Sequence, residues 1–89
     1  MIKSTITISN KLGLHARASA KLTKLAGTFR SDVFMTRNDR RINAKSIMGV
    51  MMLAAGLGAD VELETDGPDE QAAMDALRQL ITDKFGEAE

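Results

Sequence analysis

The arrangement of hydrophobic and polar residues predicts four extended segments in the chain. Residues 2–8 place isoleucine on one side and lysine or threonine on the other, which predicts a strand with one face in solvent. Residues 60–65 repeat this pattern, and residues 32–37 and 40–43 flank the sequence Asn38-Asp39. Because asparagine and aspartate favour tight turns, the last two segments are predicted to form a β-hairpin.

Three other segments have the spacing of helices. The first begins at or next to His15 and ends near Gly27, which we expect in the C′ position. The second is a short apolar stretch after its natural N-cap, Ser46. The third begins near Asp69, and we expect Asp69 or one of its neighbours to cap it. Residues 87–89 are expected to fray. The predicted core-facing residues are Ala18, Leu22, Leu25, Ala26 and Phe29 in the first helix, and Ala73, Met74, Leu77, Leu80, Ile81 and Phe85 in the third.

The order strand, helix, strand, strand, helix, strand, helix predicts an α+β fold. We expect an open two-layer sandwich in which the helices cover one face of a four-stranded sheet. With 89 residues and 44% hydrophobic content, the chain can bury one modest core and no second one. Residues 1–89 are therefore predicted to be a single domain.

Composition narrows the classes of function. The absence of cysteine excludes disulfides and thiolate metal sites, and a single histidine excludes most zinc sites, so we expect no metal or cofactor. The chain has no basic segment followed by an apolar run at its start, and no stretch approaches the roughly 18 apolar residues of a membrane span. We therefore expect a soluble, cytoplasmic protein with no membrane insertion.

Charge is unevenly divided although the net charge is zero. Residues 1–45 carry ten of the twelve basic residues and two of the twelve acidic ones, so the two parts of the chain hold +8 and −8. An acidic partner for the basic part is one interpretation, and two solvated faces that neutralise each other are the other. Nucleic acid is disfavoured, because aromatic content is only 3% and no Tyr or Trp could stack on bases. A protein partner or a phosphoryl group fits better.

His15 is the chemically distinctive residue. A helix N-terminus carries unpaired N–H groups and partial positive charge, which disfavour a protonated ring and would hold a neutral, nucleophilic imidazole. The same N–H groups, with the guanidinium of Arg17, would hold the oxygens of a phosphoryl group on that ring. The alternative is a histidine N-cap without chemistry, and the residues alone leave both interpretations open.

The apolar stretch after Ser46 is too short to bury all its side chains if it forms a helix. We expect some of Ile47, Met48 and Met51 to reach the surface, where flexible methionine suits a face that fits several partners. The alternative is that all of them lie in the core.

Two motifs together resemble the HPr family of phosphocarrier proteins: Asn10-Lys-Leu-Gly-Leu-His-Ala-Arg17 and Ala44-Lys-Ser-Ile-Met-Gly-Val-Met51. The resemblance covers essentially the whole chain. It implies an antiparallel sheet in the order 1-4-2-3, phosphorylation of His15 on Nδ1, and phosphate stabilisation by Arg17. It also implies that Enzyme I of the phosphoenolpyruvate-dependent phosphotransferase system is the donor and that IIA proteins or domains are the acceptors.

The same resemblance implies further functional residues. Ser46 matches the family's regulatory serine, which HPr kinase/phosphorylase modifies in some bacteria. One departure is Ala18, where the family usually has proline; alanine is a good helix former, so we expect a helix with a less rigid start. The residues that match the docking surface are Ala16, Ala20, Ile47, Met48 and Met51. We expect Arg17, Lys21 and Lys24 to surround this apolar patch as a basic ring, whose charge would speed the encounter with a partner.

The leading hypothesis is thus a monomeric phosphocarrier for sugar transport, in which His15 is a covalent relay and not a self-contained enzyme. The main alternative is a regulatory module, like the nitrogen-related branch of the phosphotransferase system, that reports its phosphorylation state to other proteins. A nucleic-acid-binding module is a third. A hydrolase is disfavoured, because the chain lacks Gly-x-Ser-x-Gly and His15 has no carboxylate near it in sequence to orient the ring.

Overall fold

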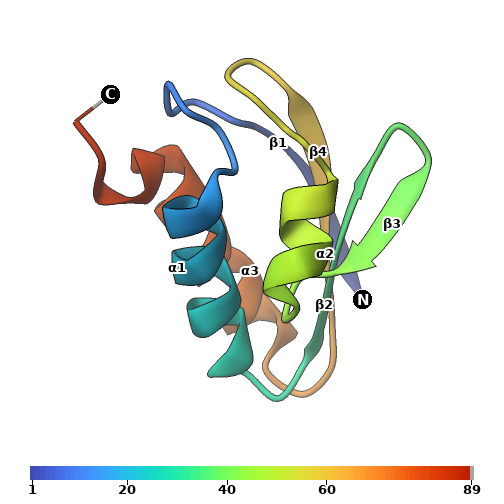
Figure 1. Ribbon diagram of the computed structural model, residues 1–89. Coiled ribbons are helices and arrows are strands. Elements are labelled where there is room, and N and C mark those ends of the chain that lie inside the picture. The colour runs from blue at the N-terminus through green and yellow to red at the C-terminus, as the bar shows by residue number, and fades with distance from the viewer. Residues whose placement is uncertain (89) are drawn as a thin grey trace.

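The computed structural model describes residues 1–88 and has the predicted element order (Figure 1). The elements are β1 (Ile2–Thr7), α1 (Ala16–Gly27), β2 (Asp32–Arg37), β3 (Arg40–Asn43), α2 (Ile47–Met52), β4 (Asp60–Asp66), α3 (Glu70–Thr82) and the 3₁₀ turn η1 (Lys84–Gly86). The four strands form one antiparallel sheet in the order β1-β4-β2-β3. Figure 1 shows α1, α2 and α3 on one side of this sheet, as the sequence predicts.

Alternation along the strands separates the core from the solvent face of the sheet. In β4, Val61, Leu63 and Thr65 are buried toward the helices. Ile2, the first residue of β1, pairs with Thr65. The predicted hairpin between β2 and β3 is also present. Its turn residues Asn38 and Asp39 both have positive φ, the conformation that a two-residue hairpin loop requires.

Side chains from the helices pack against the buried face of the sheet and complete the core. Most of the predicted core-facing residues of α1 and α3 are buried, whereas Leu25, Phe29 and Leu80 are only half-buried. Phe85 lies beyond the end of α3 and is nevertheless 1% exposed. Burial of such a ring fixes the last described turn of the chain against the domain.

At the helix ends, one expectation was wrong and one was met only in part. Gly27 is the last residue of α1 and not a left-handed C′ residue, because Thr28 continues in the right-handed helical region and its N–H donates to the last carbonyls. Asp69 occupies the N-cap position of α3, but its side chain does not cap that helix. Its carboxylate accepts instead from the N–H groups of Arg30 and Ser31 and from the Ser31 hydroxyl. The hydrogen bond from Ser31, with those from the backbone, lowers the pKa of Asp69 to about 2.

The expected fraying was also wrong for Glu87. Its N–H donates to the Lys84 carbonyl, and its side chain contacts the segment before α1. Glu89 lies outside the described residues. No helix within residues 1–88 is both long and apolar enough to cross a membrane.

Candidate functional site

The loop between β1 and α1 is held rigidly before it reaches His15. Asn10 is fully buried and donates from Nδ2 to the Gly13 carbonyl at 2.8 Å. Leu14 donates its N–H to the Ala55 carbonyl at 2.9 Å, which ties the loop to the segment after α2. Gly13 has φ +64°, and a Cβ there would lie 2.4 Å from the Ala55 oxygen. Only glycine therefore fits this turn without displacing the backbone.

His15 is the N-cap residue of α1. Its backbone is extended, with φ −76° and ψ −179°, and its carbonyl accepts the N–H of Ser19 at 2.8 Å. Its ring nitrogen Nδ1 accepts a hydrogen bond from the Arg17 N–H at 3.3 Å. The N-cap position of His15 is as predicted from the sequence, and its Nδ1 faces the amides of the helix N-terminus.

The opposite edge of the ring contacts the end of the described chain. His15 Nε2 lies 2.7 Å from Glu87 Oε2, and Asn10 Nδ2 donates to Glu87 Oε1 at 3.2 Å. The hydrogen bond from His15 lowers the pKa of Glu87; burial opposes this shift, and the bond from Asn10 reinforces it. Because Nδ1 accepts a hydrogen bond and a carboxylate cannot donate one, this arrangement selects the tautomer with its proton on Nε2.

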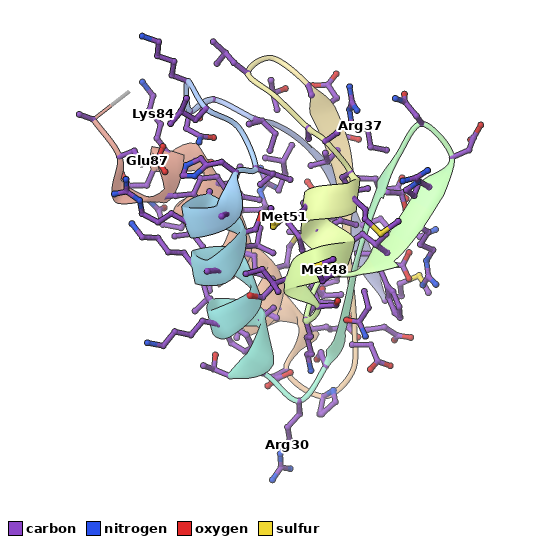
Figure 2. All side chains as sticks on the ribbon, viewed as in Figure 1. Arg30, Arg37, Met48, Met51, Lys84 and Glu87 are labelled. Atoms are coloured by element: carbon purple, nitrogen blue, oxygen red, sulfur yellow. The ribbon has the colours of Figure 1, made fainter. Side chains whose placement is uncertain are left out.

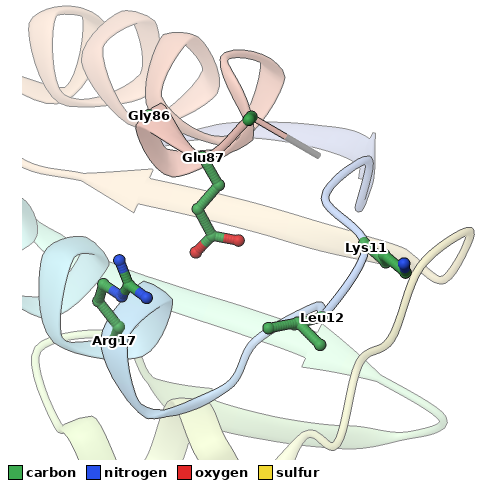
Figure 3. A pocket seen from close by; sticks show the side chains of 6 residues that line it. Lys11, Leu12, Arg17, Gly86 and Glu87 are labelled. Atoms are coloured by element: carbon green, nitrogen blue, oxygen red, sulfur yellow. The ribbon is translucent and has the colours of Figure 1, made fainter.

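Arg17 lines a cavity next to this contact. The cavity has a volume of about 500 Å³ and is lined by Lys11, Leu12, Arg17, Gly86, Glu87 and Ala88. Figure 3 shows the Arg17 guanidinium and the Glu87 carboxylate pointing into it from α1 and from the end of the chain. Two basic residues, Arg17 and Lys11, belong to this lining, so the cavity could accept an anion near the ring.

Ser46 is the N-cap of α2, as predicted. Its Oγ accepts the N–H of Gly49 at 3.2 Å, and the residue is exposed. At the other end of α2, Arg37 and Arg40 donate to the carbonyls of Leu53 and Met52. Side chains therefore bind both ends of a helix too short to be stable by itself.

The outer side of α2 is an exposed apolar surface. Ile47, Met48 and Met51 are 39%, 69% and 41% exposed, which confirms the expectation that some of them reach the surface. Met52 is 56% exposed and was not predicted. Figure 2 shows Met48 and Met51 on α2, which packs beside α1. Ala16, Ala20 and Lys24 of α1 are exposed as well.

Lys21 was expected in the basic ring around this surface, but its ammonium is engaged elsewhere. Its Nζ donates to the Phe85 carbonyl at 2.7 Å. Lys21 therefore anchors η1 to α1, and it contributes to the site by holding the turn that precedes Glu87.

The sequence did not point to Glu87, which contacts the ring, or to Asn10, which contacts Glu87. Glu87 is 72 positions from His15, and no local pattern connects the two. Asn10 lay inside the first motif, but its burial and its contact with Glu87 depend on tertiary packing. Within the described part of the chain, no cluster of His, Cys, Asp or Glu side chains could hold a metal ion.

Comparisons with known proteins agree with this geometry. A family model described as the PTS HPr component phosphorylation site matches residues 2–83. The phosphocarrier protein HPr of Cupriavidus necator is 70% identical over 89 residues, and that of Neisseria meningitidis serogroup A is 61% identical over 89 residues; both alignments cover 100% of each chain. The crystal structure of HPr-C-His from Thermoanaerobacter tengcongensis superposes with a TM-score of 0.96 at 44% identity, covering 100% of each chain.

Proposed function

Because this chain belongs to the HPr family of phosphocarrier proteins of the phosphotransferase system, we propose that His15 is the residue that carries its phosphoryl group. The observation that carries the proposal is the position of His15 at the N-terminus of α1, where Nδ1 faces the Arg17 N–H. Family membership implies Enzyme I as the donor and IIA proteins as the acceptors.

The reacting atom is Nδ1. Its lone pair attacks phosphorus on the phosphorylated donor, the Nδ1–P bond forms, and the bond between phosphorus and the donor protein breaks. The reverse exchange passes the group to the acceptor. Between these steps, the amides of the α1 N-terminus and the Arg17 guanidinium bind the phosphoryl oxygens. The protein is thus a covalent relay that depends on its partners for each step.

The docking surface is formed by Ala16 and Ala20 of α1 with Ile47, Met48 and Met51 of α2, bordered by Arg17 and Lys24. It is small, apolar and exposed, and it lies next to the helix end that holds His15. A small apolar contact permits rapid release, and basic residues at its border speed the encounter with acidic partners. These properties suit a monomeric cytoplasmic carrier that must bind donor and acceptor in turn.

Ser46 is the regulatory position in this proposal. Its hydroxyl is exposed at the N-terminus of α2, where a phosphate would be tolerated electrostatically. The added charge would lie beside Met48 and would have to be desolvated when a partner docks on the apolar surface. Phosphorylation by HPr kinase/phosphorylase, in a cell that contains it, is therefore expected to slow the charging of His15.

The central test is phosphorylation in vitro with phosphoenolpyruvate and Enzyme I, read by intact mass. The expected result is an acid-labile gain of one phosphoryl group that is lost in His15→Ala. Thr23→Ala, a substitution on the same helix away from its N-terminus, is the matched control and should be charged normally. Uptake of the label by His15→Ala would refute the assignment.

A further inference from the structure

We propose that Glu87 is a positioning residue for the phosphoryl relay: it holds the His15 ring through Nε2 and neutralises the charge that the ring acquires when Nδ1 is phosphorylated. This inference rests on the proposed function of His15 and assigns a role to a second residue of the same site. It follows from the 2.7 Å contact between His15 Nε2 and Glu87 Oε2.

The carboxylate is held by several contacts. Its second oxygen accepts from Asn10 Nδ2 at 3.2 Å, and Asn10 is itself fully buried and bonded to Gly13. The side chains of His15 and Glu87 are only 24% and 13% exposed, so water competes weakly for their hydrogen bond. One carboxylate thus joins the ring to the loop that precedes it.

The chain beyond α3 is folded so that Glu87 reaches the ring. Lys84, Phe85 and Gly86 all have positive φ, which turns the chain sharply back toward α1. Two of these residues are not glycine, and such a conformation persists only where packing compensates for it. The compensation comes from the buried Phe85 ring and from the hydrogen bond between Lys21 Nζ and the Phe85 carbonyl.

The carboxylate has a specific chemical consequence. With the ring proton held on Nε2, the Nδ1 lone pair is free to attack phosphorus. When the Nδ1–P bond forms and the donor's bond to phosphorus breaks, the Nε2 proton stays in place and the ring becomes a phosphoimidazolium cation. Glu87 then faces a positive ring across a charge-assisted hydrogen bond, which is stronger than the bond to the neutral ring. An aspartate plays the corresponding part for the histidine of serine proteases.

The two edges of the ring therefore have separate roles. Nδ1 faces the amide of Arg17 and receives the phosphoryl group, whereas Nε2 faces Glu87. Arg17 also lies close enough to Glu87 to favour its ionised form. The negative carboxylate is thus placed on the edge of the ring opposite the incoming phosphoryl group.

The test compares Glu87→Gln and Glu87→Ala with the unaltered protein. Phosphoryl exchange with Enzyme I is followed to equilibrium, and ¹⁵N NMR of the unphosphorylated ring reports which nitrogen carries the proton. We expect Glu87→Gln to lower the equilibrium constant for His15 phosphorylation about tenfold, because the amide oxygen can still accept from Nε2 but no longer carries the charge that stabilises the phosphorylated ring. In Glu87→Ala we expect the same loss or more, together with a ring signal no longer restricted to the Nε2-protonated tautomer.

Glu62→Gln is the matched control. It makes the same substitution on β4, at a half-buried position that alternates with the core residues of that strand. It should exchange phosphate like the unaltered protein, and circular dichroism should show that all three variants are folded. Equilibrium constants within about twofold of the unaltered protein in both Glu87 variants, with His15 still phosphorylated, would overturn the inference. Phosphate uptake by His15→Ala would instead refute the proposed function, so the two failures are distinguishable.

Discussion

Phe85 allows the structure of the end of the chain to be tested directly. Its ring is 1% exposed, and it belongs to the main hydrophobic cluster although it lies outside the three helices. Replacing a fully buried phenylalanine with alanine costs about 3 to 5 kcal/mol, because the ring's burial is lost and a cavity remains. We expect Phe85→Ala to lie near the lower figure, since η1 follows the last helix and can partly detach to relieve the cavity.

A loss of about 3 kcal/mol is a large share of the stability of a domain of this size, which is roughly 4 to 13 kcal/mol. It should lower Tm by about 12 °C or more. The assay is urea unfolding followed by circular dichroism, with the free energy of unfolding obtained by linear extrapolation. Leu80→Ala is the control, because Leu80 is half-buried on α3 and its truncation should cost clearly less.

The same variant connects stability to the site. Detachment of η1 would withdraw Glu87 from His15, so Phe85→Ala should also reproduce the phosphoryl-exchange defect expected of Glu87→Ala. A loss of stability below about 1 kcal/mol would refute the reasoning, because a ring that contributes so little cannot be packed in the core. Glu87 would then have no anchor to hold it at the ring.

Three other perturbations test separate features. Asp69→Asn should destabilise the protein at neutral pH and have a much smaller effect near pH 2. The reason is that the pKa of Asp69 is lowered from 3.8 to about 2 on folding, so its stabilising contribution is present above the higher value and is lost as pH falls through the lower one. A difference in urea midpoint that does not change with pH would contradict this. Gly13→Ala should lower the free energy of unfolding by at least about 1 kcal/mol, because φ is +64° and the new Cβ would meet the Ala55 oxygen. An unchanged Tm would show that the loop can move to accommodate the methyl group. Ser46→Asp should remain folded, because its carboxylate can still cap α2. Enzyme I should phosphorylate it more slowly than the unaltered protein, because the new charge lies beside Met48 on the docking surface. Comparable phosphorylation rates would argue against regulation through docking.

Much of the fold could be read from local sequence because its causes are local. Alternation in residues 2–8 and 60–65 reflects the period of a strand, and Asn38-Asp39 supplies the positive φ of a tight hairpin turn. Ser46 accepts from the N–H three residues on, and His15 accepts from the N–H two residues on. Such bonds form between near neighbours, so the residue types and their spacing suffice to predict them.

Other features depend on contacts between segments that are distant in the sequence. The Asp69 carboxylate has several donors within reach, and only the approach of the chain between α1 and β2 determines that it binds Ser31 and not the amides of α3. Gly27 can adopt either sign of φ, and in the structure Thr28 continues the right-handed helical conformation and donates its N–H to the carbonyls of the last turn.

The contact between His15 and Glu87 is the clearest case. The residues around His15 were enough to predict that it would lie at a helix N-terminus close to Arg17, because a helix end and its cap are properties of a few consecutive residues. It could not determine that a carboxylate 72 positions away would bind the other ring nitrogen. That depends on the burial of Phe85 and the turn it stabilises, and burial is a property of the whole packed domain and not of any short segment.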